Sequence, residues 1–95
     1  MVKVTVNGKI IAESDKTVVI ENNHYFPPDS VEKSFFTDSK TSSVCPWKGN
    51  AAYYDATVDG ESIQDIAWYY PEPKEKAKHI KNYVAFYKSK VQIDA

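Results

Sequence analysis

Two dipeptides, Asn7-Gly8 and Asp59-Gly60, constrain the fold of this chain more than any other feature. Each follows a stretch in which apolar and polar residues alternate, Val2 to Val6 in one case and Asn50 to Val58 in the other. Both dipeptides favour type I′ turns, because the two central residues of that turn need a positive φ. Alternation with a period of two is typical of a strand with one buried face. The sequence therefore predicts antiparallel hairpins.

Further short strands are predicted between the turns, and Pro27-Pro28 interrupts them because proline has no N–H to donate to a ladder. Strands are expected at 9–12, 17–20, 24–26, 33–37 and 66–70, with polar loops at 38–43 and 62–65.

The end of the chain shows the only helical pattern. Pro73 suits the first turn of a helix, Glu75 complements the helix dipole, and Ala77 and Ile80 share one face. We expect a helix over about 74–82, followed by a final strand. The predicted fold is a mainly β, compact single domain over residues 1–95, built of short antiparallel strands with one short C-terminal helix.

Composition excludes several classes of protein. The net charge is −1, with 12 basic and 13 acidic residues spread along the chain, so no nucleic-acid partner is expected. A single cysteine cannot form an internal disulfide. No stretch approaches the roughly 20 apolar residues that cross a bilayer, and the first residues lack a signal-peptide pattern. We expect a cytoplasmic protein without a membrane partner.

The sequence Cys45-Pro46-Trp47-Lys48-Gly49 holds the only cysteine. Proline at the second position favours a β-turn, which brings Cys45 and Lys48 within about 7 Å between Cα atoms. A nearby ammonium lowers a thiol pKa, so Cys45 is a candidate nucleophile, with Lys48 activating it or holding an anion. His24 is the best candidate base. The alternative is that Cys45 is a buried small hydrophobe and Lys48 is solvated.

A metal site is not expected. Structural zinc takes four thiolate or imidazole ligands, usually with paired spacing, and the chain offers only Cys45, His24 and His79. No cofactor is predicted.

The aromatic residues form a second group of candidates, since nine of the thirteen lie from Trp47 onward. Adjacent pairs such as Tyr53-Tyr54 and Trp68-Tyr69 point to both faces of a sheet, so one core cannot hold them all. One ring of each pair must face a pocket, a partner or water. A ring-lined pocket suits a small-molecule ligand. Tyrosine is also an ordinary strand residue, and the same rings could form a homodimer interface.

Four motifs together make the chain resemble the DUF427 family of small domains without an assigned function. The resemblance covers about Val6 to Tyr87, and its motifs are Asn-His-Tyr-Phe-Pro at 23–27, Cys-Pro-Trp-Lys-Gly at 45–49 with Ala-Tyr-Tyr at 52–54, Ala-Trp-Tyr-Tyr-Pro-Glu-Pro at 67–73, and Ile80 with Tyr-Val-Ala-Phe-Tyr at 83–87.

The resemblance implies a β-tent, in which two sheets meet at an angle. Some relatives of that architecture hold zinc through paired cysteine motifs, which this chain lacks. The family is also labelled nucleotidyltransferase, but no Gly-Ser followed by Asp-x-Asp is present to hold two metal ions. The residues of the family's pocket, by resemblance, are His24, Tyr25, Cys45, Trp47, Lys48, Tyr53, Trp68 and Tyr70.

Three functions follow from these observations. We favour a small-molecule-binding module with an aromatic pocket around the Cys-Pro-Trp-Lys-Gly motif, in which Lys48 or His24 orients a polar or anionic group. The alternatives are an enzyme that uses Cys45 or Lys48, and a structural or interaction domain that acts as a homodimer.

Overall fold

The computed structural model describes all 95 residues as nine strands and three 3-10 helices. In chain order these are β1 (Val2–Val6), β2 (Lys9–Ser14), β3 (Val18–Ile20), β4 (Asn23–Tyr25), η1 (Pro28–Ser30), η2 (Lys33–Phe35), β5 (Phe36–Cys45), β6 (Gly49–Val58), β7 (Glu61–Tyr69), η3 (Glu75–Ile80), β8 (Val84–Phe86) and β9 (Gln92–Asp94).

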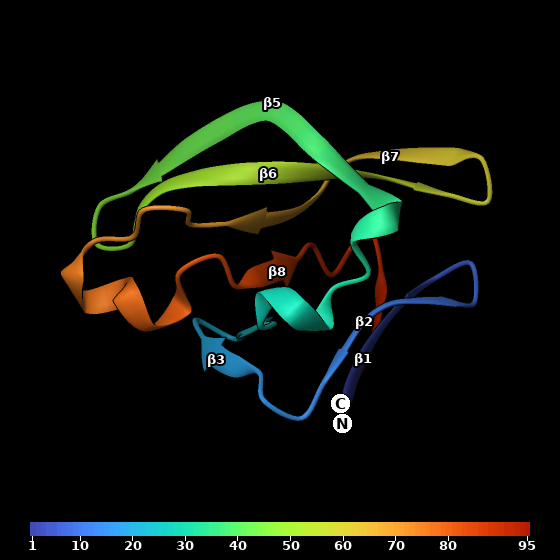
Figure 1. Cartoon of the computed structure of the whole chain (residues 1–95), viewed down its shortest axis with the longest axis horizontal. Coiled ribbons are helices and arrows are strands. Elements are labelled where there is room, and N and C mark those ends of the chain that lie inside the picture. The colour runs from blue at the N-terminus through green and yellow to red at the C-terminus, as the bar shows by residue number, and fades with distance from the viewer.

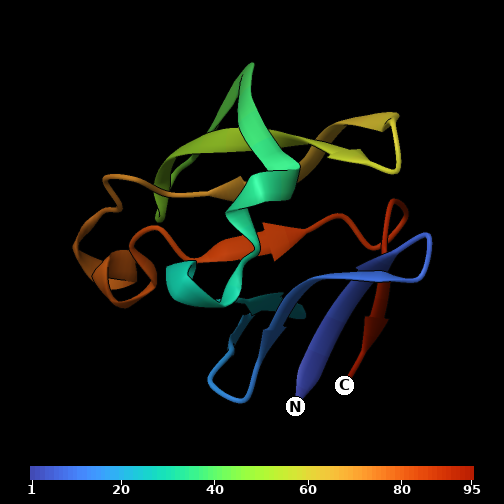
Figure 2. The same cartoon turned by 45° about the vertical axis from the view of Figure 1, so that its right-hand side comes forward.

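The strands form three antiparallel sheets, with orders β2-β1-β9, β3-β4 and β5-β6-β7-β8. Strands β5, β6 and β7 of the largest sheet lie on one side of the molecule, opposite the two smaller sheets (Figures 1 and 2). Phe26 and Val84 exchange two backbone hydrogen bonds, of 2.8 and 2.9 Å, which join the β3–β4 hairpin to β8. The prediction of a compact, mainly β fold of antiparallel strands is confirmed.

Both glycine dipeptides form the turns that the sequence predicts. Asn7 and Gly8 have φ of 51° and 76° between β1 and β2, and Asp59 and Gly60 have φ of 52° and 78° between β6 and β7. The main chain of each turn is therefore in the left-handed region, which asparagine, aspartate and glycine adopt most readily.

The two predicted polar loops are wrong, because both segments lie inside strands. The first is part of β5 and the second part of β7, and each contains a bulge in its pairing with β6. Ser39 and Thr41 donate hydroxyl hydrogen bonds to the Asp65 carboxylate, and the Asp65 N–H donates to Asp55 over 2.8 Å. These polar residues, which are typical of loops, form hydrogen bonds with one another across the two bulges. The strand predicted at 33–37 likewise begins only at Phe36, after η2.

The predicted C-terminal helix is reduced to the six-residue 3-10 helix η3. Ala77 and Ile80 are buried, as the pattern predicts. The helix cannot extend to residue 82, because the Asn82 N–H donates to the Tyr70 carbonyl over 3.0 Å and Asn82 has a φ of 63°. None of the three 3-10 helices has the length and hydrophobicity of a membrane-spanning segment.

The large sheet buries both of its faces. Tyr54, Ala56 and Val58 of β6 face one apolar cluster, and Ala51 and Tyr53 face another. We call these the first and second cores. The buried members of the first core are Val4, Val6, Ile11, Ala12, Phe26, Val31, Ala56, Val58, Ile66, Ala67, Val84 and Phe86. Those of the second core are Tyr25, Ala51, Tyr53, Tyr70, Ala77, Ile80 and Ala85.

Candidate functional site

The Cys-Pro-Trp-Lys-Gly motif forms the tight turn between β5 and β6, as predicted. Cys45 pairs with Gly49 at the end of the ladder, and Gly49 has a φ of 112°. A Cβ atom on Gly49 would lie 3.3 Å from the carbonyl oxygen of Glu72. The Lys74 N–H also donates to the Lys48 carbonyl over 2.9 Å. The turn is therefore packed closely against the Pro-Glu-Pro segment that follows β7.

Lys48 is the only charged side chain among the buried residues, with 4% of its surface exposed. Its Nζ donates a hydrogen bond to the Glu21 carboxylate. The same ammonium lies 4.8 Å from the ring centroid of Trp47 and 5.7 Å from that of Tyr70, within the range of cation–π attraction. The alternative interpretation of Lys48 as a solvated side chain is wrong.

Glu21 lies in the turn between β3 and β4, where it has a φ of 52°. Its carboxylate covers the outer side of the Lys48 ammonium. Its side chain remains 56% exposed. The hydrogen bond from Lys48 lowers the pKa of Glu21. Burial lowers the pKa of Lys48, but the Glu21 hydrogen bond and neighbouring anionic groups outweigh it, and the net pKa is raised. The pair is ionised, and no sequence signal pointed to Glu21.

Cys45 is half-buried beside the Lys48 ammonium, as the turn predicts. Burial raises the pKa of Cys45, but hydrogen bonds from the backbone N–H groups of Lys48 and Trp47 and the Lys48 charge outweigh it. The net pKa lies below the usual value for a thiol. The turn thus favours the thiolate form.

Four predicted aromatic residues converge next to this turn, in and around the second core. Tyr25, Tyr53 and Tyr70 are buried, and the half-buried Trp68 packs against them. The Trp68 Nε1 donates to the Tyr25 hydroxyl over 3.1 Å, and the two rings meet edge to face with centroids 6.3 Å apart. Burial raises the pKa of Tyr25 and of Tyr70, so both hydroxyls stay protonated at neutral pH.

These rings pack against one another and do not enclose a cavity. None of the five cavities of the molecule is lined by Trp47, Trp68 or Tyr70. Trp47 is the exception to burial, with 38% of its surface exposed at the tip of the turn. A ligand at this site would therefore contact Lys48 from the side that Glu21 now covers.

His24 does not join the cluster. It follows the alternation of β4, so its side chain points to the face opposite Tyr25, and its Nδ1 lies 2.9 Å from the Thr17 hydroxyl. His79 is exposed on η3. No group of three or more His, Cys, Asp or Glu side chains comes together in a way that could hold a metal ion.

The fold and the site define a small antiparallel β domain with one buried, ion-paired lysine in a hairpin turn. The chain matches a family described as a domain of unknown function, DUF427, over residues 1–95, and it belongs to that family. No curated protein matches the chain.

Proposed function

We propose that this protein binds a small anionic molecule at Lys48 and that the Glu21 carboxylate occupies the position of the ligand's anionic group until it is displaced. The observation that carries the proposal is the asymmetry of the ion pair. Lys48 is buried, whereas its carboxylate partner belongs to an exposed side chain on a surface turn.

A purely structural role explains this pair poorly. Removing an ammonium from water costs several kcal/mol, and apolar residues of similar volume often replace buried ion pairs without loss of stability. An exposed carboxylate offsets little of that cost, because water screens its attraction to the ammonium. A buried lysine whose partner can swing into solvent is instead suited to exchanging one anion for another.

The groups around Lys48 suit a carboxylate or phosphate ligand. Trp47 and Tyr70 fix the ammonium from two sides through their rings. The backbone N–H groups of Trp47 and Lys48, which now face the Cys45 sulfur, are additional donors at the same turn. Backbone donors next to a cation are a common arrangement for binding anionic oxygens.

The test is a thermal-shift screen of the wild type against inorganic phosphate, nucleotides, sugar phosphates and small carboxylates, followed by calorimetry of any compound that stabilises it. A ligand at a hundredfold excess over its Kd stabilises the folded state by about 2.7 kcal/mol. Lys48→Met is expected to abolish the shift, and Lys16→Met, at an exposed lysine outside every ion pair, is expected to preserve it.

Glu21→Gln gives the more specific result. Removing the competing carboxylate is expected to lower the melting temperature of the free protein, because Lys48 loses its partner. It is also expected to tighten anion binding several-fold, by the reciprocal of the fraction of sites that Glu21 leaves free in the wild type. Equal stabilisation of the wild type and Lys48→Met by the same anion would contradict the proposal.

A second candidate is an enzyme in which Cys45 is the nucleophile, and the lowered pKa of its thiol favours it. The rate of alkylation by iodoacetamide as a function of pH tests this. The pH midpoint of the alkylation rate is expected to lie below that of the same cysteine in urea-unfolded protein. Lys48→Met is expected to move this midpoint upward. A native midpoint at or above the unfolded one excludes an activated cysteine.

A further inference from the structure

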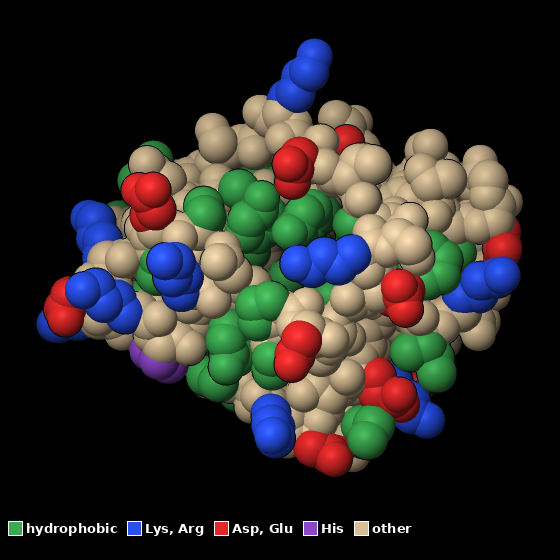
Figure 3. Space-filling model, in the orientation of Figure 1, with side chains coloured by type: hydrophobic (Ala, Val, Ile, Leu, Met, Phe, Trp, Pro, Cys, Tyr) green, Lys and Arg blue, Asp and Glu red, His purple; other side chains and the backbone are tan.

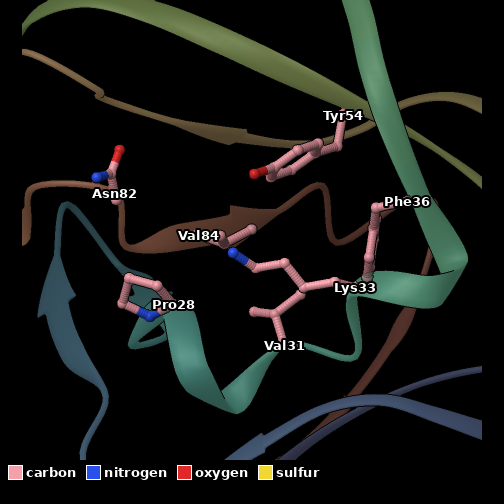
Figure 4. Close-up of a pocket in the computed structure, with 7 residues that line it drawn as sticks. All are labelled: Pro28, Val31, Lys33, Phe36, Tyr54, Asn82 and Val84. Atoms are coloured by element: carbon pink, nitrogen blue, oxygen red, sulfur yellow. The ribbon is translucent and has the colours of Figure 1, made fainter.

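A cavity of about 400 Å³ lies on the other face of the large sheet, between the η1–η2 segment and strands β6 and β8. In Figure 3 apolar side chains gather around a hollow at the centre of this face, with a lysine across it. The cavity shares no lining residue with the turn that holds Lys48. It is lined by Pro28, Val31, Lys33, Phe36, Tyr54, Asn82 and Val84 (Figure 4).

The apolar walls of this cavity are rigid parts of the fold. Val31 and Val84 belong to the first core, with 7% and 2% of their surfaces exposed. The Tyr54 ring is stacked on Tyr69 with centroids 4.5 Å apart, and it meets Phe36 at 5.7 Å. Contacts on two sides therefore hold this ring in place as one wall of the cavity. Preformed apolar cavities of this size are typical of small-molecule sites.

The polar groups of the cavity are few and are directed inward. In Figure 4 the Lys33 ammonium and the Tyr54 hydroxyl both extend toward the middle of the lining residues, Tyr54 from above and Lys33 from below. Lys33 takes part in none of the five ion pairs of the molecule. No acidic residue lines the cavity. The lining therefore combines apolar side chains with a few polar groups, among them one cation that has no counter-ion.

Tyr54 is available as a hydrogen-bond donor. Burial and the nearby Asp38 raise the pKa of Tyr54 by more than the neighbouring Tyr69 hydroxyl lowers it, so the Tyr54 hydroxyl keeps its proton. Asp38 is the carboxylate in this neighbourhood, but it accepts a hydrogen bond from the Tyr69 hydroxyl at 3.4 Å and does not line the cavity.

We propose that this cavity binds a monocarboxylate with a compact apolar body, whose carboxylate is held by Lys33 and the Tyr54 hydroxyl and whose body packs against Val31, Phe36 and Val84. The charge of Lys33 selects an anion over a neutral or cationic molecule of the same shape. This site is independent of anion binding at Lys48, because the two lie on opposite faces of the large sheet.

Three compounds of similar shape test the proposal: phenylacetate, 2-phenylethanol and 2-phenylethylamine. Each is titrated into 15N-labelled protein comprising residues 1–95, and the amide shifts locate the site and give the Kd. We expect shifts around the cavity, with phenylacetate binding about two- to fivefold more tightly than the alcohol, as suits an ion pair open to water, and the amine binding weakest.

Lys33→Gln is expected to remove the preference for the acid over the alcohol while leaving the alcohol's own affinity unchanged. Lys33 is exposed, so this variant is expected to fold normally. Val31→Phe, which fills the cavity, is expected to weaken the binding of all three compounds. Lys48→Met is expected to leave the binding of all three unchanged. Shifts that cluster at the Lys48 turn, an absence of shifts, or a preference for the acid that survives Lys33→Gln would each overturn the proposal.

Discussion

The two cores lie on opposite faces of one sheet and differ in chemistry. The first core packs aliphatic and phenylalanine side chains between the large sheet and β1 and β2, and every buried member is apolar. The second core contains three buried tyrosines, and the ion pair of Lys48 lies beside it. Of the polar groups that the sequence singles out, Cys45, Lys48, Tyr25 and Tyr70 meet at the second core.

The two cores therefore stabilise the domain in different ways. An apolar cluster stabilises by removing surface from water and needs no hydrogen-bond partners. A core of tyrosines stabilises only if each hydroxyl is satisfied, and those hydroxyls then place polar groups at fixed positions near the surface. We infer that the first core holds the domain together, and that the second positions the Lys48 turn.

The largest effect is expected from Phe26→Ala in the first core. Phe26 is fully buried and packs edge to face on Phe86, with centroids 5.6 Å apart. Loss of the ring is expected to lower the free energy of unfolding by about 3–5 kcal/mol, measured by urea denaturation. Val19→Ala, at an exposed position on β3, is the control and is expected to change it by less than about 0.5 kcal/mol. A small effect of Phe26→Ala would refute the role given to the first core.

Gly49→Ala is expected to lower the free energy of unfolding by about 1–3 kcal/mol, because alanine is strained at a positive φ and its Cβ meets the Glu72 carbonyl oxygen. Gly8→Ala is a matched control, since Gly8 also has a positive φ but its added Cβ has no neighbour within 4 Å. Thermal denaturation of both variants then gives the additional loss at Gly49, from the close contact and from the greater strain of alanine at a φ of 112°. Equal losses would show that the packing of the turn adds nothing.

Tyr25→Phe tests whether the second core depends on its hydroxyls. The Trp68 N–H loses its acceptor, and we expect a loss of about 1–2 kcal/mol in urea denaturation. Tyr53→Phe is the control, because its partner Ser43 is exposed and can turn to water, so a smaller loss is expected. If both variants are as stable as the wild type, the second core is an apolar cluster like the first.

The smallest effect is expected in the alkaline range. Burial raises the pKa of Tyr69 and of Tyr87 to about 12, and it also raises that of Tyr70. Unfolded tyrosine ionises near pH 10. The stability that these groups contribute is therefore present below about pH 10 and is lost as the pH rises through 12.

Phenylalanine cannot ionise, so Tyr70→Phe is expected to move the midpoint of alkaline unfolding upward relative to wild type, and more than Tyr69→Phe does. Tyr70 is the more deeply buried of the two. Circular dichroism followed against pH gives the midpoints. A larger shift from Tyr69→Phe would place the alkaline sensitivity in the first core instead.

Local sequence was sufficient for much of the fold. The two glycine dipeptides predicted both turns, and proline in Cys45-Pro46-Trp47-Lys48 predicted the third, because each turn is decided by the φ that its own residues can adopt. The loops at 38–43 and 62–65 were predicted wrongly for a tertiary reason. Their polar residues are satisfied by one another across the sheet, through Asp65, which alternation along a single strand cannot reveal.

The candidate site was predicted only in part. The neighbourhood of Cys45 and Lys48 followed from the turn between them, whereas Glu21 is 27 residues away from Lys48 in sequence. His24 was grouped with the site because it adjoins Tyr25, yet adjacent residues of a strand face opposite ways. The cavity beside Lys33 and Tyr54 had no sequence signal, since its walls come from three separate stretches of the chain, at 28–36, 54 and 82–84.

Residues close together in the chain are enough to predict the antiparallel hairpins, the tight turn at the Cys-Pro-Trp-Lys-Gly motif and the membership of the DUF427 family. The face that each aromatic ring occupies, and the burial of Lys48 against Glu21, became visible only in the folded molecule. Burial and ion pairing depend on what packs against a residue from distant segments, and adjacent side chains do not contain that information.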